Sequence, residues 1–150
     1  MGSYPTPRLA REPSVLPFYQ VTLLESPLVL RGRNPRALQP EEVTEACELL
    51  LVAAAQHRCP YWLLDGRAND QHQPVELHDW MREEYFPRAR AVLGQQLQVA
   101  FLVTPDVWQG LQARGYEAPQ DWASFALHAG WFTEEPLALT WLHMQRTSGW

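Results

Sequence analysis

Apolar and polar residues follow one another along this chain in a pattern that predicts alternating strands and helices. Apolar side chains take every second position from Tyr19 to Leu23, which is the period of a half-buried strand. A break at 25–27 contains a proline, and the apolar run 28–30 then leads into Arg31-Gly32-Arg33. These two segments therefore predict an antiparallel hairpin at the start of the fold.

Residues 40–57 show the clearest helical pattern. Pro40 suits the first helical position, and the acidic residues that follow it suit the positive end of the helix dipole. From Val43 to Ala54, apolar residues recur at i, i+3, i+4, i+7, i+8 and i+11 and form one stripe. His57 and Arg58 close the last turn, so we expect an amphipathic helix that packs on a sheet.

The continuous apolar run 61–64, bounded by Pro60 and by Asp65-Gly66, predicts a central strand that is covered on both faces. Further elements are expected as a helix over 74–93 with a kink at Pro87, a strand over 97–103, a helix over 105–113, a last strand near 125–131 and a final helix capped by Thr133. A helical spacing of Trp122, Phe125 and Ala129 competes with that last strand. The order β-β-α-β-α-β-α-β-α predicts an α/β fold with a mixed, mostly parallel sheet and helices on its faces.

The length of 150 residues suits one domain, and 46% hydrophobic with 19% charged residues is a globular composition. Residues 1–17 contain four prolines and are expected to form a flexible arm. We expect the single domain to occupy 18–145 and residues 146–150 to form a C-terminal tail.

Composition also restricts the function and the location. The net charge of −5 disfavours binding to nucleic acid, and the chain has no lysine for a Schiff base or a P-loop. Its apolar stretches are too short to span a membrane, and the N-terminus lacks the apolar core of a signal peptide. We interpret Cys47 and Cys59 as reduced thiols and expect a cytoplasmic protein.

Three segments carry a resemblance to a known family. They are the Asp-ended strand Tyr61-Trp62-Leu63-Leu64-Asp65, the piece Val99-Ala100-Phe101-Leu102-Val103-Thr104-Pro105, and the ending 131–142 with its aromatic-acidic turn followed by Ala-x-x-Trp-Leu. Over roughly 18–145 the chain resembles the small stand-alone branch of the STAS-like family, the fold of anti-sigma-factor antagonists. The resemblance implies a STAS-like fold and a role in bacterial signalling through a protein partner.

Signalling members of that family carry a phosphorylated serine or threonine just after the Asp-ended strand. The corresponding loop here, 65–72, contains neither residue. It is nevertheless polar and leaves the carboxyl end of a strand, where parallel α/β sheets usually bind ligands. We therefore predict a partner-binding surface at Asp65, Arg67, Asp70 and His72, with helix capping and turn chemistry as the alternative.

Three arginines, Arg31, Arg33 and Arg36, follow the second predicted strand. Guanidinium groups bind phosphate or carboxylate through paired hydrogen bonds, so these residues are a candidate anion site. The alternative is a solvated surface whose arginines balance the carboxylates of nearby helices.

The chain has seven tryptophans, of which Trp62, Trp80 and Trp108 are expected on inward faces. They suit core packing, and as an alternative they would line a pocket for a small apolar ligand, as in related folds that carry lipids.

Groups arranged for catalysis are not apparent in the sequence. The serines lie outside a nucleophile-elbow motif, Cys47 falls on a buried stripe, and Cys59 with His57 would meet at the end of the sheet opposite the usual active site. The spacing of His72 and His78 fits no standard zinc motif.

We predict a non-catalytic binding or regulatory module without a cofactor, acting through a protein partner or as a homodimer. An apolar-ligand carrier and a hydrolase or metal enzyme using Asp65, His72 and His78 are the alternatives.

Overall fold

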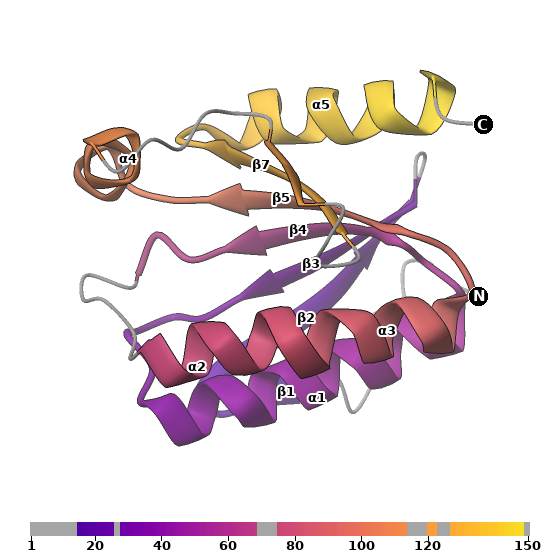
Figure 1. Cartoon of the computed structure of the whole chain (residues 1–150), viewed down its shortest axis with the longest axis horizontal. Helices are drawn as coiled ribbons and strands as arrows, with labels where there is room; N and C mark the ends of the chain where they lie inside the picture. Colours follow the sequence, from indigo (N-terminus) through magenta and orange to yellow (C-terminus); the bar gives the residue numbers. More distant parts are fainter. Residues whose placement is uncertain (1–14, 26–27, 69–74, 114–119, 123–126, 149–150) are drawn as a thin grey trace, which may run out of the picture.

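A mixed β-sheet lies between two layers of helices (Figure 1). The structure is a computed structural model that describes residues 15–25, 28–68, 75–113, 120–122 and 127–148. Its strands are β1 (Val15–Leu16), β2 (Tyr19–Leu24), β3 (Val29–Arg33), β4 (Tyr61–Asp65), β5 (Leu97–Leu102), β6 (Gln120–Trp122) and β7 (Leu127–Phe132). Its helices are α1 (Pro40–His57), α2 (Val75–Trp80), the π turn η2 (Met81–Tyr85), α3 (Phe86–Leu93), α4 (Pro105–Ala113) and α5 (Glu135–Ser148).

The strands take the order β1-β2-β3-β4-β5-β7-β6 across the sheet. The four central strands β3, β4, β5 and β7 are parallel neighbours, while β1, β2 and β6 pair antiparallel at the two edges. Helices α1 and α2–α3 cover one face, and α5 covers the other (Figure 1). The predicted α/β class and the antiparallel hairpin of β2 with β3 are therefore confirmed, and β4 lies at the centre of the sheet as expected.

Several observed element boundaries differ from the predicted ones. The two-residue strand β1 lies inside the segment 1–17 that we expected to be a flexible arm, because it pairs with β2 at the sheet edge. The short strand β6 was not expected and pairs with β7. Helix α5 begins at Glu135, two residues after the expected cap at Thr133, and continues to Ser148 beyond the expected domain end at residue 145.

The helix over 75–93 differs from a kinked α-helix by containing the π turn η2. At its end the N–H of Phe86 donates a hydrogen bond to the carbonyl of Met81, five residues earlier. Pro87 follows and has no N–H to continue the α-helical pattern, so the wider turn lies just where the normal bonding would fail. The irregularity expected at Pro87 thus exists as a π turn before it.

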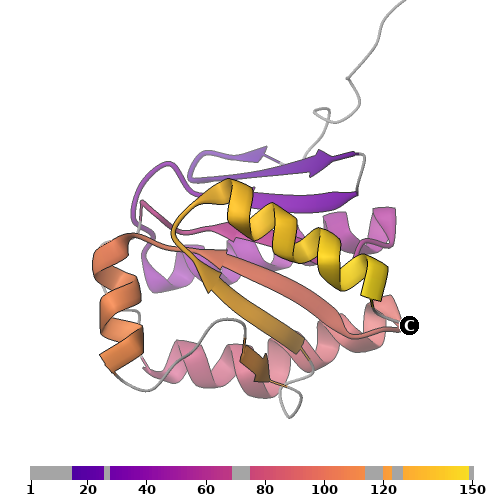
Figure 2. The ribbon, with the colours of Figure 1, turned by 90° about the horizontal axis from the view of Figure 1, so that it is seen from above.

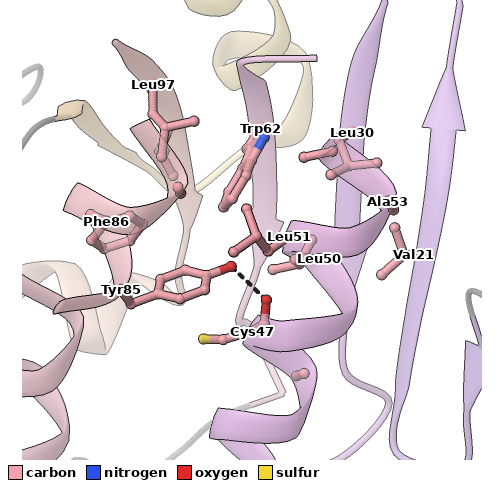
Figure 3. Close-up of a cluster of buried hydrophobic side chains, with 14 of the residues drawn as sticks. Val21, Leu30, Cys47, Leu50, Leu51, Ala53, Trp62, Tyr85, Phe86 and Leu97 are labelled. Carbon is pink, nitrogen blue, oxygen red and sulfur yellow. Dashed lines mark hydrogen bonds between the residues drawn. The ribbon is translucent and has the colours of Figure 1, made fainter. Parts of the chain in front are cut away.

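The larger part of the core fills the space between the sheet and the layer of α1 with α2–α3 (Figure 3). The indole of Trp62 is completely buried, and its N–H donates to the carbonyl of Cys59 at 2.8 Å. The hydroxyl of Tyr85 donates to the carbonyl of Cys47 on α1 at 2.6 Å, which joins the two helices of this layer (Figure 3). The apolar stripe predicted on α1 accordingly faces this core.

A smaller cluster lies under α5 on the opposite face. It consists of Val29, Leu63, Ala100, Leu102, Ala138, Trp141 and Leu142. Helix α5 contacts the strands β4, β5 and β7, and seen from above β2 and β3 extend beside it (Figure 2). The α5 face of the sheet is therefore only partly covered. Polar side chains can lie on the uncovered part, beyond the first turn of α5.

Candidate functional site

Strand alternation brings charged residues from two separate chain segments onto the α5 face of the sheet. Val29 and Leu63 belong to the cluster under α5, and side chains two residues apart share a face. Arg31 and Arg33 on β3 and Asp65 on β4 therefore lie on that same face. In the parallel register Arg33 is opposite Asp65, at the carboxyl ends of both strands. This is the edge at which parallel α/β sheets usually bind ligands.

The carboxylate of Asp65 is the buried centre of the site, with a side chain only 3% exposed. One of its oxygens accepts hydrogen bonds from the backbone N–H and from Nε of Arg67, at 3.1 and 3.0 Å. The other oxygen accepts from Nη2 of Arg67 at 2.8 Å. The turn after β4 thus folds Arg67 back onto the end of its own strand.

A second carboxylate comes from the start of α5. Glu135 accepts two hydrogen bonds from Arg31, one from Nε at 3.1 Å and one from Nη2 at 2.8 Å. The same Nη2 of Arg31 lies 3.5 Å from Asp65, and Nη2 of Arg67 lies 3.8 Å from Glu135. We call these five residues, Arg31, Arg33, Asp65, Arg67 and Glu135, the arginine cluster.

Arg33 is the most exposed guanidinium of the arginine cluster, at 49% of its side chain. Its Nε lies 4.0 Å from Asp65, which is a charge contact longer than a hydrogen bond. Arg67 is also exposed, at 42%. Because the cluster holds three guanidinium groups and two carboxylates, it keeps one positive charge, and that surplus lies on the side facing solvent.

The electrostatics of Asp65 follow from this arrangement. Burial is the largest single influence and by itself raises the pKa of the carboxyl. The hydrogen bonds from Arg67 and the charges of Arg67 and Arg31 together outweigh burial, so the pKa of Asp65 lies below its ordinary value of 3.8. The carboxylate is therefore ionised at neutral pH and holds the arginines in place.

The structure regroups the two sites that the sequence suggested. Arg31 and Arg33, predicted as an anion site, and Asp65 and Arg67, predicted as a partner surface, belong to one cluster. Glu135 was missed, since an acidic residue in a first helical turn already has a role at the helix dipole. The sequence pointed to Glu135 only through its position. It follows the last parallel strand and therefore lies at the same edge of the sheet as the cluster.

Arg36, which the sequence groups with Arg31 and Arg33, pairs with a carboxylate outside the arginine cluster. Its guanidinium forms two hydrogen bonds with the carboxylate of Glu42 on α1, at 2.9 and 2.8 Å. Glu42 also accepts from the backbone N–H of Gln39 at 2.9 Å, which caps the helix. These contacts lower the pKa of Glu42 to about 2, with the hydrogen bond from Arg36 as the largest cause. Arg36 thus stabilises the start of α1.

Asp70 and His72, the other predicted partner-binding residues, lie outside the described residues. The backbone of His78 lies in α2, and its side chain is also outside them. Among the described residues, no group of three or more His, Cys, Asp and Glu side chains is placed to hold a metal ion.

Cys47 and Cys59 are free, buried thiols, and burial raises the pKa of Cys47 to about 12. Such thiols are poor nucleophiles.

The three tryptophans predicted as a ligand pocket have different surroundings. Trp62 is 0% exposed, with its ring centroid 6.3 Å from that of Tyr85. Trp80 stacks on Tyr85 at 5.4 Å and borders an open groove of about 440 Å³ that neither Trp62 nor Trp108 lines. Trp108 lies on α4 and packs at the margin of the same core. Of the three tryptophans, Trp80 alone is in the lining of this groove.

Comparison of this chain with protein-family models, with curated proteins and with solved structures finds no match in any of the three. In the described part of the chain, none of the helices has both the length and the apolar character that crossing a bilayer requires.

Proposed function

We propose that this protein is a non-catalytic binding module that recognises an anionic group on a protein partner at the arginine cluster. The recognised group is a phosphate or a carboxylate in an exposed segment of the partner. The observation that carries the proposal is the excess of arginine at the carboxyl edge of the sheet, with Arg33 about half exposed beside the buried Asp65.

The contacts within the cluster support binding without chemistry. Arg67 and Arg31 each use Nε and Nη2 toward carboxylates, and a guanidinium has five N–H donors in all. Donors therefore remain for a ligand, while Asp65 and Glu135 hold the side chains in position. Preorganised arginines of this kind bind phosphate and carboxylate with a low ordering cost.

The proposal includes a STAS-like origin for the domain. Support for it comes from the element order and from the Asp-ended strand β4, whose aspartate anchors the cluster. The loop after β4 has no serine or threonine between residues 65 and 72. We therefore assign the phosphate or carboxylate to the partner rather than to this chain.

The test uses the full chain and a short peptide that contains one phosphoserine between glutamates, with the unphosphorylated peptide for comparison. Binding is measured by isothermal titration for wild type, Arg33→Gln and Arg36→Gln. Both variants lose one exposed positive charge, but Arg36 is bound to Glu42 outside the cluster. We expect Arg33→Gln to weaken binding about fivefold or more, and Arg36→Gln to change it by less than about twofold.

Equal losses in the two variants would show that only the overall charge matters and would contradict the proposal. The same would follow if neither peptide binds to wild type at millimolar concentration. Thermal unfolding of both variants checks that the fold is retained, which is expected because the two side chains are 49% and 54% exposed.

A further inference from the structure

A groove lies on the other face of the sheet from the arginine cluster. It lies between the first turns of α1 and α2 and has a volume of about 440 Å³. Its lining consists of Pro40, Glu41, Thr44, Glu76, Leu77 and Trp80. Helices α1 and α2 cover the face of the sheet that α5 does not, so the groove and the arginine cluster lie on opposite faces of the sheet (Figure 1).

The floor of the groove is apolar and fixed. Leu77 is 7% exposed and belongs to the core, and Trp80 packs on that core at its margin. The ring of Trp80 stacks on Tyr85, with an interplanar angle of 23° and 5.4 Å between centroids. Tyr85 is itself held by its hydrogen bond to Cys47 (Figure 3). A ligand would therefore meet a preformed aromatic surface.

Two glutamates flank this floor. Glu41 on α1 and Glu76 on α2 are both exposed, and in the described part of the chain neither forms an ion pair. The hydroxyl of Thr44 is already bonded to the backbone carbonyl of Glu41 at 2.7 Å. The carboxylates are thus the polar groups of the groove that remain available to a ligand.

Both glutamates lie in first helical turns, where their negative charges are partly offset by the positive ends of the helix dipoles. The sizes of these charges decide whether the groove remains negative. A helix N-terminus carries about half of a positive charge, so two N-termini offset about one of the two carboxylate charges. About one negative charge remains at the groove. An anion is therefore disfavoured there, and a cation is favoured.

The charge of the whole helical layer has the same sign. Helix α1 contains four glutamates and no basic residue other than His57 at its end, and residues 75–93 contain four acidic residues and three arginines. Together these helices hold a net charge of −5, which equals that of the entire chain. A cationic partner is therefore attracted to this layer.

We propose that the groove between α1 and α2 binds a basic segment of a protein partner. An arginine of that segment lies between Glu41 and Glu76, and its planar guanidinium or the apolar residue beside it packs on Trp80 and Leu77. Arginine suits this position because it combines charge pairing with stacking on an aromatic ring. The protein then has two binding surfaces of opposite charge on opposite faces of one sheet.

The test is an NMR titration of the full chain with a short peptide in which arginine and leucine alternate with serine. A second peptide with glutamate in place of arginine serves for comparison. We expect the arginine peptide to shift the backbone amides of Leu77 and Trp80 and the indole N–H of Trp80. The double variant Glu41→Gln/Glu76→Gln should weaken binding about fivefold or more.

The matched control is Glu45→Gln/Glu84→Gln, which removes two exposed charges from the same helical layer outside the groove. We expect it to change the affinity by less than about twofold. Equal losses in the two double variants would overturn the proposal, because attraction to the layer would then be unspecific. Shifts confined to other faces of the molecule would overturn it as well. Neither result bears on phosphopeptide binding at Arg33.

Discussion

Arg31 and Glu135, which are 104 positions apart in the sequence, are joined by two hydrogen bonds between one guanidinium and one carboxylate. The pair connects strand β3, near the beginning of the fold, to the first turn of the last helix, α5. Both side chains are about three quarters buried, with exposed fractions of 22% and 27%. The bond thus fixes where α5 begins over the sheet as well as holding Arg31 beside Asp65.

The first prediction concerns this pair. Arg31→Ala and Glu135→Ala should each lower the free energy of unfolding by about 1–2 kcal/mol, more than exposed ion pairs contribute, because paired charged hydrogen bonds are partly shielded from water. Urea unfolding of the single and double variants gives the coupling energy, which we expect at about 1 kcal/mol. A coupling energy near zero would mean that the two residues act independently. Arg36→Ala, which affects a more exposed pair, should cost less.

The second prediction concerns Gly32, whose missing side chain makes room for Tyr19 on the neighbouring strand. A Cβ at position 32 would lie 2.9 Å from Cζ of Tyr19, closer still to its hydroxyl oxygen, and 3.1 Å from a methyl carbon of Leu50. Gly32→Ala should therefore destabilise the protein by about 1–3 kcal/mol, as overpacking of a core does.

Thermal and urea unfolding of Gly32→Ala measure this cost. The same substitution in a Tyr19→Phe background should cost less, since the atom nearest to the added methyl group is then absent. If Gly32→Ala is as stable as wild type, or if Tyr19→Phe gives no relief, the steric explanation is wrong.

The third prediction concerns the pH dependence of stability. The folded-state pKa of Asp65 lies below its ordinary value of 3.8, so its stabilising contribution is complete above that value and is lost as the pH falls through the folded-state pKa. Asp65→Asn should therefore be less stable than wild type near neutral pH, and the difference should shrink below about pH 4. Urea unfolding at a series of pH values measures both curves. A difference that stays constant down to acid pH would contradict the assigned pKa.

The sequence predicted the framework of the fold better than its chemistry. Periodicity located α1 and the buried strand β4 because both have apolar patterns that depend only on local spacing. The same patterns could not show that Arg31 faces Asp65, since that depends on the register between two strands. Arg36 illustrates the limit: it is close to Arg33 in sequence, yet a turn leads it to Glu42 at the start of a helix.

Two further differences have physical causes that local patterns do not contain. Strand β1 has only two residues and exists because β2 offers an unpaired edge, so no periodicity could reveal it. The groove at Trp80 arises where the first turns of two helices meet, and those helices are joined through β4 rather than directly. Glu41 and Glu76 then line the same groove, which the sequence pattern of neither helix predicts by itself.

The concentration of the net charge on α1 and α2–α3 has a consequence for how the molecule behaves in a field. The acidic helices α1 and α2–α3 lie on one face of the sheet and the arginine cluster, with its surplus positive charge, lies on the other, so these two regions form an electric dipole across the sheet. Near a charged surface or a charged partner the molecule will rotate before it touches. Which face arrives first is thus selected at a distance, and this selection weakens as salt shortens the range of the field.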